Sequence, residues 1–315
     1  MELHTEINRP LVTHLYYPAA PGSKMSSINN VYHSPEVAKR AEMNMDIGRR
    51  PLIVFSHGLG GNPEYFSWLL ADLVKHLGCV IAAPVHKGSD NAYYEPKIAL
   101  KAYLRAQDCN MIAETMLLTK FRNIIDESKM WFCGFSQGGY AGLLLAGLNP
   151  ENYTIPDVNT CGLVEKALCA SNEDVQVLVS KCHLEAEMRR NRTSEIFDKF
   201  LVISPVLTNY LNLTNQSDNP QLKNKQIFVA LGDKDNLVAE NAADLEKLPN
   251  TTVKHFPEAM HVSFRAQLKG DAINSKQNLY NSLAFDKRKN IAEIHNKLLN
   301  EAIKFFTEKD IPVKL

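Results

Sequence analysis

The sequence lacks several features that would assign it to a class at once. Across its 315 residues, no apolar run reaches the roughly 18 residues that a membrane-spanning helix needs. Its first segment, MELHTEINRPLVTHLYY, has neither the basic start nor the apolar stretch of an export signal. We therefore expect no transmembrane segment and a cytoplasmic location for the chain as given, or a secreted or periplasmic location if a leader has been removed.

An excess of charge of one sign is also lacking, because 35 Lys and Arg residues balance 35 Asp and Glu residues. This balance argues against a nucleic-acid partner that is bound through bulk charge. With 45% hydrophobic and 22% charged residues, the composition is that of a folded chain rather than a disordered one. We expect a small-molecule partner, while the composition leaves the oligomeric state open.

The six cysteines show no CxxC pair and no zinc-type spacing, so we expect no metal site and no haem. Cys79 and Cys133 lie inside apolar runs, where cysteine usually acts as a small buried hydrophobe. Cys161, Cys169 and Cys182 cluster in one polar segment, and whether two of them form a disulfide stays open at this point.

Short β-type runs alternate with longer helical patterns along the chain. This alternation is typical of an α/β fold, with a mostly parallel central sheet flanked by helices. The predicted strands cover residues 11–17, 51–56, 79–84, 130–135, 200–204, 226–231 and 252–256. The predicted helices cover residues 64–76, 97–124 and 137–147, with a C-terminal helix whose apolar repeat runs from Ile291 to Phe305.

Three polar stretches interrupt the alternation. Residues 18–50 are rich in Ser, Asn and Pro, which predicts a surface loop between early strands. Residues 266–290 form a second polar excursion before the last helix. Residues 150–198 stand between a helix and the next strand, where a small helical cap or lid could be inserted. We therefore expect a single domain over residues 1–315 with a cap insertion at 150–198.

The sharpest local signal is Gly-Phe-Ser-Gln-Gly-Gly at 134–139, directly after the apolar run MWFC and before the helix-forming AGLLLAG. A G-x-S-x-G sequence between a strand and a helix is the pattern of a nucleophile elbow. The tight turn leaves no room for side chains beside the serine, and it exposes the hydroxyl at the helix N-terminus, where the dipole favours negative charge. Ser136 is therefore the predicted nucleophile.

A serine needs a base and an orienting acid, which in this fold follow the nucleophile in the order acid, then histidine. Asp235 follows the predicted strand 226–231 and is the predicted acid, with Asp233 two residues earlier as the alternative. His261 follows the last predicted strand and is the predicted base. Its nearest competitor, His255, lies within that strand, where an ordinary strand position is the simpler interpretation.

Acyl transfer also needs hydrogen-bond donors for an oxyanion. The backbone N–H of Gln137, directly after the nucleophile, is the first predicted donor. The loop after the strand 51–56 reads His57-Gly-Leu-Gly-Gly, and Leu59 N–H is the second predicted donor. His57 stands far before Ser136 in the chain, so we expect its imidazole to orient this loop rather than to act as the base.

These segments resemble a known group of enzymes. PLIVFSHGLGG, followed by a helix, by CVIAAP and by His-Lys-Gly-Ser-Asp at 86–90, resembles the predicted dienelactone hydrolases and the platelet-activating-factor acetylhydrolase group of α/β-hydrolases. The opening run RPLVTHLYYP, Arg105 and Asp108, the elbow and the final IHNKLLNEAIKFF extend the resemblance over nearly the whole chain. The elbow GFSQGG itself is closer to that of acyl-protein thioesterases and small carboxylesterases.

The resemblance implies an α/β-hydrolase fold with Ser136, Asp235 and His261 as the triad, and with Leu59 and Gln137 as oxyanion donors. It implies a serine hydrolase that cleaves a carboxylic ester, such as a short-acyl esterase or an acetylhydrolase-like enzyme of lipid metabolism, without a cofactor. The partner would be a small-molecule ester or a lipid. The alternatives are an acyl-protein or lipid thioesterase, a phospholipase A-type lipase and a non-catalytic binding protein with a hydrolase fold.

Overall fold

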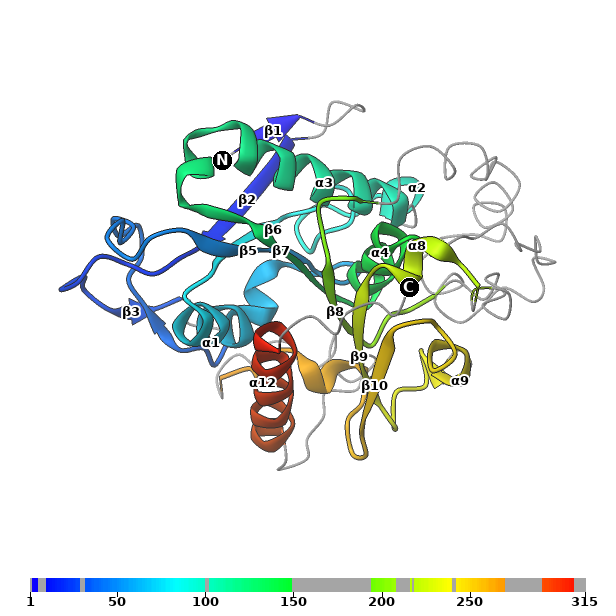
Figure 1. Ribbon diagram of the computed structural model, residues 1–315. Helices are drawn as coiled ribbons and strands as arrows, with labels where there is room; N and C mark the ends of the chain where they lie inside the picture. The colour runs from blue at the N-terminus through cyan, green and yellow to red at the C-terminus, as the bar shows by residue number, and fades with distance from the viewer. Residues whose placement is uncertain are drawn as a thin grey trace.

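The computed structural model describes residues 2–4, 10–28, 32–99, 102–148, 194–207, 216, 218–239, 242–269 and 291–308. Its centre is an eight-stranded sheet with the strand order β1-β2-β6-β5-β7-β8-β9-β10 (Figure 1). The strands are β1 (Glu2–His4), β2 (Pro10–Tyr16), β5 (Arg50–Ser56), β6 (Val80–Pro84), β7 (Ile125–Phe135), β8 (Lys199–Ile203), β9 (Gln226–Gly232) and β10 (Thr251–Phe256).

All pairs from β6 through β10 are parallel, whereas β2 pairs antiparallel with both β1 and β6. The predicted mostly parallel sheet is therefore confirmed. Each predicted strand is also present, with ends that differ by one residue or two except at the start of β7. The strands could be predicted because strands buried on both faces of a parallel sheet appear in the sequence as continuous apolar runs.

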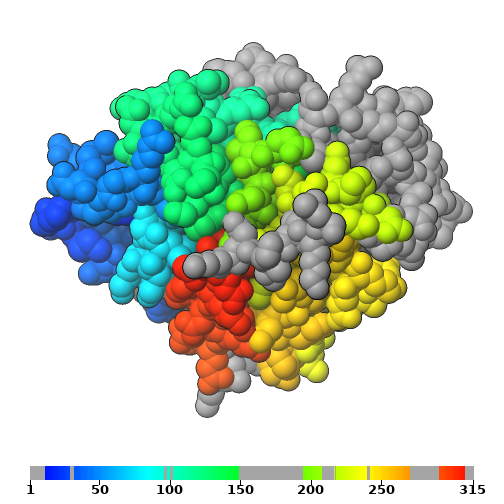
Figure 2. Space-filling view, viewed as in Figure 1, coloured from blue at the N-terminus to red at the C-terminus, as the bar shows by residue number. Residues whose placement is uncertain are grey.

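Helices cover both faces of the sheet (Figure 1). The longer ones are α1 (Ser67–Leu77), α3 (Ala102–Leu118), α4 (Gln137–Ala146) and α12 (Ile291–Thr307). Buried side chains of α3 and α4 share one apolar cluster, while those of α1 and α12 share another. The C-terminal helix α12, red in Figure 2, lies on the surface between the α1 segment and the segment of β10.

Strand β5 shows how the sequence divides between these two clusters. Leu52 and Val54 belong to the cluster of α3 and α4, whereas Ile53 and Phe55 belong to the cluster of α1 and α12. Successive side chains of a strand point to opposite faces, so an unbroken apolar run serves both. Each of these four side chains is fully buried, which contributes about 1.5–3 kcal/mol per residue relative to exposure.

Three features differ from the sequence-based expectations. The helix predicted over 97–124 is α2 (Pro96–Ala99), α3 and a 3₁₀ turn η2 (Lys120–Ile124), with Thr119 extended before the turn. Strand β7 begins at Ile125 rather than at residue 130. The apolar pattern missed this start because residues 127–129, Glu-Ser-Lys, are polar and exposed. The predicted loop at 18–50 contains a short antiparallel pair, β3 (Ser26–Ser27) and β4 (Glu36–Val37).

Several predictions lie outside the described residues. These are the cap at 150–198 up to residue 193, with its cysteines, and the excursion at 266–290 beyond residue 269. Cys79 and Cys133 are buried, as predicted, and burial raises the pKa of both thiols. Within the described ranges, every helix is too short or too polar to cross a membrane.

The parallel strands bring four loops to one edge of the sheet. The carboxyl ends of parallel strands point the same way, and open α/β sheets bind ligands at that edge. Here β5 leads into the glycine-rich loop at 57–61, β7 into Ser136, β9 into the turn with Asp235, and β10 into the loop with His261. Every predicted site residue therefore follows a strand at the same edge.

Candidate active site

Ser136 occupies the turn between β7 and α4 in a strained conformation, with φ 57° and ψ −122°. Such backbone angles cost a non-glycine residue about 1–3 kcal/mol, so the surroundings must hold them. The N–H of Ser136 donates to the Ile203 carbonyl at 2.9 Å, and the Ser136 carbonyl accepts from Tyr140 N–H at 3.0 Å. These bonds to β8 and α4 fix the turn from both sides.

The flanking glycines are required by close backbone approach. A Cβ on Gly134 would lie 2.7 Å from the carbonyl carbon of Gly138. A Cβ on Gly138 would lie 2.6 Å from the carbonyl carbon of Ser56 and 2.7 Å from the His57 oxygen. The elbow therefore packs directly against the end of β5, and no side chain fits between them.

His261 lies between Ser136 and Asp235. Its Nε2 is 2.9 Å from Ser136 Oγ, and its Nδ1 is 2.7 Å from Asp235 Oδ2. A carboxylate can only accept, so Nδ1 carries the proton and Nε2 is left to accept from the serine hydroxyl. The Asp235 side chain is fully covered, whereas the His261 side chain remains 17% exposed.

The side chain of Asp235 is held by its own turn. Asp235 Oδ1 accepts from the Leu237 N–H at 3.0 Å, so the second carboxylate oxygen is used locally while Oδ2 faces His261. The neighbouring Lys234 N–H donates to the Ala259 carbonyl at 3.0 Å. This bond joins the turn of the acid to the loop that leads to the histidine.

The histidine loop begins with a 3₁₀ turn, η5 (His261–Phe264), which two aromatic side chains hold from outside. Trp68 Nε1 donates to the Phe264 carbonyl at 3.2 Å, and His295 Nε2 lies 3.1 Å from the Ser263 carbonyl. The two rings stack at 3.7 Å. Burial lowers the pKa of His295 to about 4, so its ring is neutral at pH 7.

The alternative acid and base form a separate pair on the surface. Asp233 Oδ1 lies 2.6 Å from His255 Nδ1, and Glu246 Oε1 lies 3.0 Å from His255 Nε2. The hydrogen bond to Asp233, followed by that to Glu246, raises the pKa of His255. The structure therefore brings Asp235 and His261 to Ser136, and it leaves Asp233 and His255 bonded to each other.

The residues predicted as oxyanion donors lie in two segments beside Ser136. Gln137 is the first residue of α4, where a backbone N–H has no acceptor within its own helix. The peptide before Leu59 runs close to the elbow, because a Cβ on Gly58 would lie 3.0 Å from Ser136 Cβ. The Phe135 ring packs against this same glycine and, at 4.7 Å between centroids, against the His261 ring.

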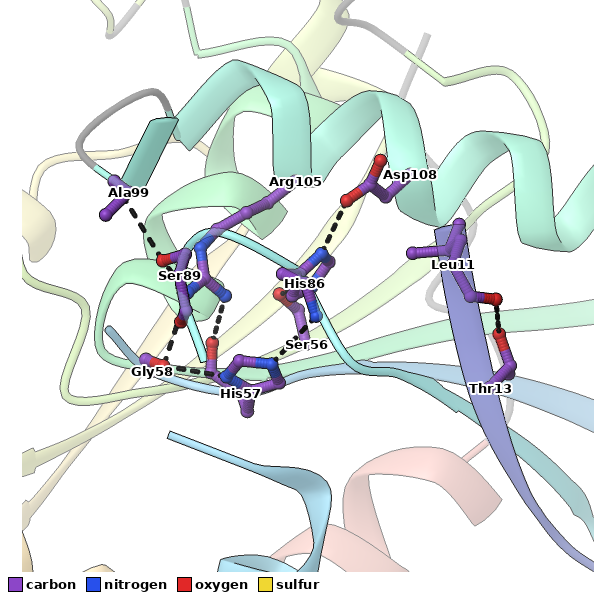
Figure 3. Close-up of polar contacts among 10 residues, drawn as sticks. All are labelled: Leu11, Thr13, Ser56, His57, Gly58, His86, Ser89, Ala99, Arg105 and Asp108. Carbon is purple, nitrogen blue, oxygen red and sulfur yellow. Dashed lines mark hydrogen bonds and ion pairs between the residues drawn. The ribbon is translucent and has the colours of Figure 1, made fainter. Parts of the chain in front are cut away.

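Behind the glycine-rich loop lies a buried polar network that the sequence analysis did not assemble (Figure 3). Asp108 Oδ2 lies 2.7 Å from His86 Nδ1, and His86 Nε2 lies 2.9 Å from Ser56 Oγ. This second chain of Ser, His and Asp is at most 1% exposed at every member, so no substrate can reach its serine. The available signal was a pair of charged residues three apart, Arg105 and Asp108, both in the buried part of α3.

His57 belongs to this network. Its Nε2 accepts from the backbone N–H of His86 at 3.1 Å, so the ring proton is on Nδ1, which lies 2.8 Å from the Gly58 carbonyl. Burial, together with the positive charge of Arg105, lowers the pKa of His57 well below its usual range. The ring is therefore neutral, and the two hydrogen bonds it makes here join it to the backbone of Gly58 and His86.

Within the described residues, no three His, Cys, Asp or Glu side chains gather in a way that could hold a metal ion.

The comparisons with known proteins agree with this architecture, which is the α/β-hydrolase fold. A family model described as platelet-activating factor acetylhydrolase, isoform II, matches residues 24–97. Among solved structures, a ferulic acid esterase from Streptomyces cinnamoneus matches with a TM-score of 0.57 at 14% identity, covering 98% of this chain and 86% of that chain. No curated protein gives a significant match.

Two further structures are similar at lower scores. An esterase from Thermogutta terrifontis, Est2 with bound butyrate, matches with a TM-score of 0.49 at 14% identity, covering 98% of this chain and 96% of that chain. Est1E from Butyrivibrio proteoclasticus with bound ferulic acid matches with a TM-score of 0.47 at 11% identity, covering 98% of this chain and 100% of that chain.

Proposed function

We propose that this protein is a serine esterase that hydrolyses a carboxylic ester. The observation that carries the proposal is the continuous hydrogen-bonded chain from Ser136 through His261 to the covered carboxylate of Asp235. Three residues separated by 26 and 125 positions in sequence meet here in the order that nucleophilic catalysis requires. A strained elbow and two candidate oxyanion donors complete the parts of an acyl-transfer site.

In the proposed mechanism, Ser136 Oγ attacks the ester carbonyl carbon while His261 Nε2 takes its proton. Asp235 stabilises the imidazolium, and the N–H groups of Leu59 and Gln137 stabilise the tetrahedral oxyanion. The imidazolium then gives its proton to the leaving alkoxide, and the C–O bond breaks. A water molecule, deprotonated by His261, then attacks the acyl carbon; the bond from that carbon to Ser136 Oγ breaks, His261 returns the proton to Oγ, and the acid leaves. No step requires a cofactor.

The proposed substrate is an ester with a short acyl group. The support is the match of residues 24–97 to a family model named for an acetylhydrolase. The sequence also leads us to expect a single domain with a cap over residues 150–198. Such a cap would favour short acyl groups, because it would leave little room for a longer chain. A longer acyl chain or a thioester would instead favour the thioesterase or lipase alternative, and a panel of esters separates them.

The first test is the identity of the nucleophile. A fluorophosphonate reagent should label wild-type protein at Ser136, as mapped by mass spectrometry of the digested protein. Ser136→Ala should lose the label and at least about three powers of ten in turnover of p-nitrophenyl acetate, because the triad works as a unit. A chelator should leave wild-type turnover unchanged.

The matched control is Ser56→Ala, which breaks the second, buried chain of Ser, His and Asp. This variant should still be labelled at Ser136, because the reagent cannot reach Ser56. Loss of labelling only in Ser56→Ala, or near-normal turnover by folded Ser136→Ala, would contradict the proposed function. A melting temperature close to that of the wild type establishes that each variant is folded.

A further inference from the structure

Arg105 is a buried cation that grips the backbone of the glycine-rich loop (Figure 3). It lies on α3 and is only 2% exposed. Its Nη1 donates to the His57 carbonyl at 2.5 Å, and its Nη2 lies 3.3 Å from the Gly58 carbonyl. Nη2 also donates to the carbonyl of Ser89 at 3.1 Å and to its Oγ at 2.6 Å. One guanidinium thus joins the loop after β5 to the loop after β6.

The Gly58 carbonyl receives an unusual concentration of donors. His57 Nδ1 lies 2.8 Å from this oxygen and Arg105 Nη2 lies 3.3 Å from it, while Gly61 N–H donates to it at 3.1 Å. The carbonyl of Gly58 and the N–H of Leu59 belong to one planar peptide unit, in which the two groups point in opposite directions. Donors that fix the carbonyl therefore also fix the direction of Leu59 N–H.

We propose that Arg105 is a positioning residue that orients the N–H of Leu59 toward the oxyanion by holding the carbonyls of His57 and Gly58. The inference rests on the proposed function, since it concerns the oxyanion of that reaction. Arg105 lies outside the triad and does not touch the oxyanion. It acts on the oxyanion only through the peptide unit between Gly58 and Leu59.

Charge and position both support this role. A cation beside a carbonyl oxygen polarises the peptide, which makes the N–H at its other end a stronger donor. Three of the five residues in this loop are glycines, so few of its own side chains can fix it, and a donor must lie within a few tenths of an ångström of its place to act. The neutral ring of His57 provides a second hydrogen bond to the Gly58 carbonyl oxygen without adding a second charge.

Arg50 provides a matched control at the opposite end of the same strand. It is also buried, at 4% exposure, and its guanidinium also donates to two backbone carbonyls, those of Gly78 and Asn44. It stands where β5 begins, whereas the loop held by Arg105 follows the end of β5. Replacing either arginine by lysine disturbs bonds to backbone carbonyls, but only Arg105 contacts the loop beside the candidate site.

The test compares the inhibition constants of two inhibitors that share one carbon skeleton. A trifluoromethyl ketone adds to the catalytic serine and forms a tetrahedral oxyanion, whereas the corresponding alcohol binds without forming one. Arg105→Lys and Arg105→Gln should lower kcat for p-nitrophenyl acetate by about 10- to 100-fold, with KM changed by less than about threefold. Ki for the ketone should rise in proportion to the loss in kcat, while Ki for the alcohol stays constant.

Turnover is expressed per site that reacts with the fluorophosphonate, so that unfolded protein does not contribute to kcat. Arg50→Lys should leave the ratio of the two Ki values within about twofold of wild type. Equal changes in Ki for ketone and alcohol, or a fall in kcat without weaker ketone binding, would mean that Arg105 merely supports the fold, and either result overturns the inference.

If both Arg105 variants fail to fold, Ser89→Ala decides the matter. It removes one acceptor of Nη2 while keeping the guanidinium, and it should raise the ratio of ketone Ki to alcohol Ki about three-fold, whereas an unchanged ratio overturns the inference. A wild-type protein that hydrolyses no ester, or that is labelled at another residue, would instead overturn the proposed function itself.

Discussion

Replacing Asp235 by asparagine tests the proposed acid at almost constant shape. In the reaction, His261 becomes a cation 2.7 Å from the carboxylate. At that separation and an effective dielectric constant of about 20, the attraction is about 6 kcal/mol, which corresponds to about four powers of ten in rate. The asparagine amide can also donate to Nδ1 of His261, which favours the tautomer with the proton on Nε2 and leaves no base beside Ser136. We expect kcat to fall by about 10³- to 10⁴-fold in Asp235→Asn.

Asp233→Asn is the control, because it makes the same chemical change two residues away. Asp233 pairs with His255, and their side chains are 39% and 43% exposed. Asp233 bonds to His255 rather than to His261, so kcat should change by less than about threefold, and the exposed pair contributes less than about 1 kcal/mol to stability. The assay is turnover of p-nitrophenyl acetate by both variants, per site labelled with fluorophosphonate. A larger loss in Asp233→Asn than in Asp235→Asn would refute the reasoning.

Other consequences concern packing, pH and substrate length. Gly138→Ala should lower the free energy of unfolding in urea by about 2 kcal/mol or more, because its Cβ would overlap the Ser56 backbone. Gly48→Ala should lower it by only about 1 kcal/mol, because its Cβ would meet open space and only the positive φ of 71° is unfavourable. The raised pKa of His255 means that its ion pairs stabilise the fold below about pH 6.5 and lose this contribution as pH rises through the higher folded value. The stability difference between wild type and His255→Gln should therefore be greatest near pH 6 and shrink toward pH 8, staying below about 1 kcal/mol; a constant difference would contradict this. Specificity constants should peak for acyl groups of about two to six carbons, each methylene adding about 0.8 kcal/mol until the pocket is full, and a steady rise through palmitoyl esters would contradict the short-acyl proposal.

The fold could be predicted because the strands that matter are continuous apolar runs. The segment Leu52 to Phe55 is apolar at every position, which indicates a strand covered on both sides without any knowledge of its neighbours. The polar start of β7 shows the limit of this signal. Its residues 127–129 are exposed and carry no apolar pattern, so only the pairing of Arg50 with Ile125 reveals that the strand already begins there.

For the candidate site, only local signals could be read from the sequence. The glycines around Ser136 predicted the elbow, because the constraint they satisfy lies within a few residues. Asp233 and Asp235 could be ranked from their position in the turn, but the hydrogen bonds that separate them go to different histidines, 22 and 26 positions away. The grip of Arg105 on His57 spans 48 positions and has no local pattern, so it emerges only from the assembled fold.

Under the proposed function, the contacts of Trp68 and His295 with the loop of His261 link the order of synthesis to the completion of the candidate site. Trp68 reaches the Phe264 carbonyl across 196 positions, and its stacking partner belongs to α12, the last helix in the described chain. A ribosome releases the nucleophile and the glycine-rich loop early, while the base follows β10 and its support comes later still. A nascent chain would therefore remain unreactive toward esters until residues 291–308 had emerged and docked. Such a chain would fold slowly, because its decisive contacts join distant segments.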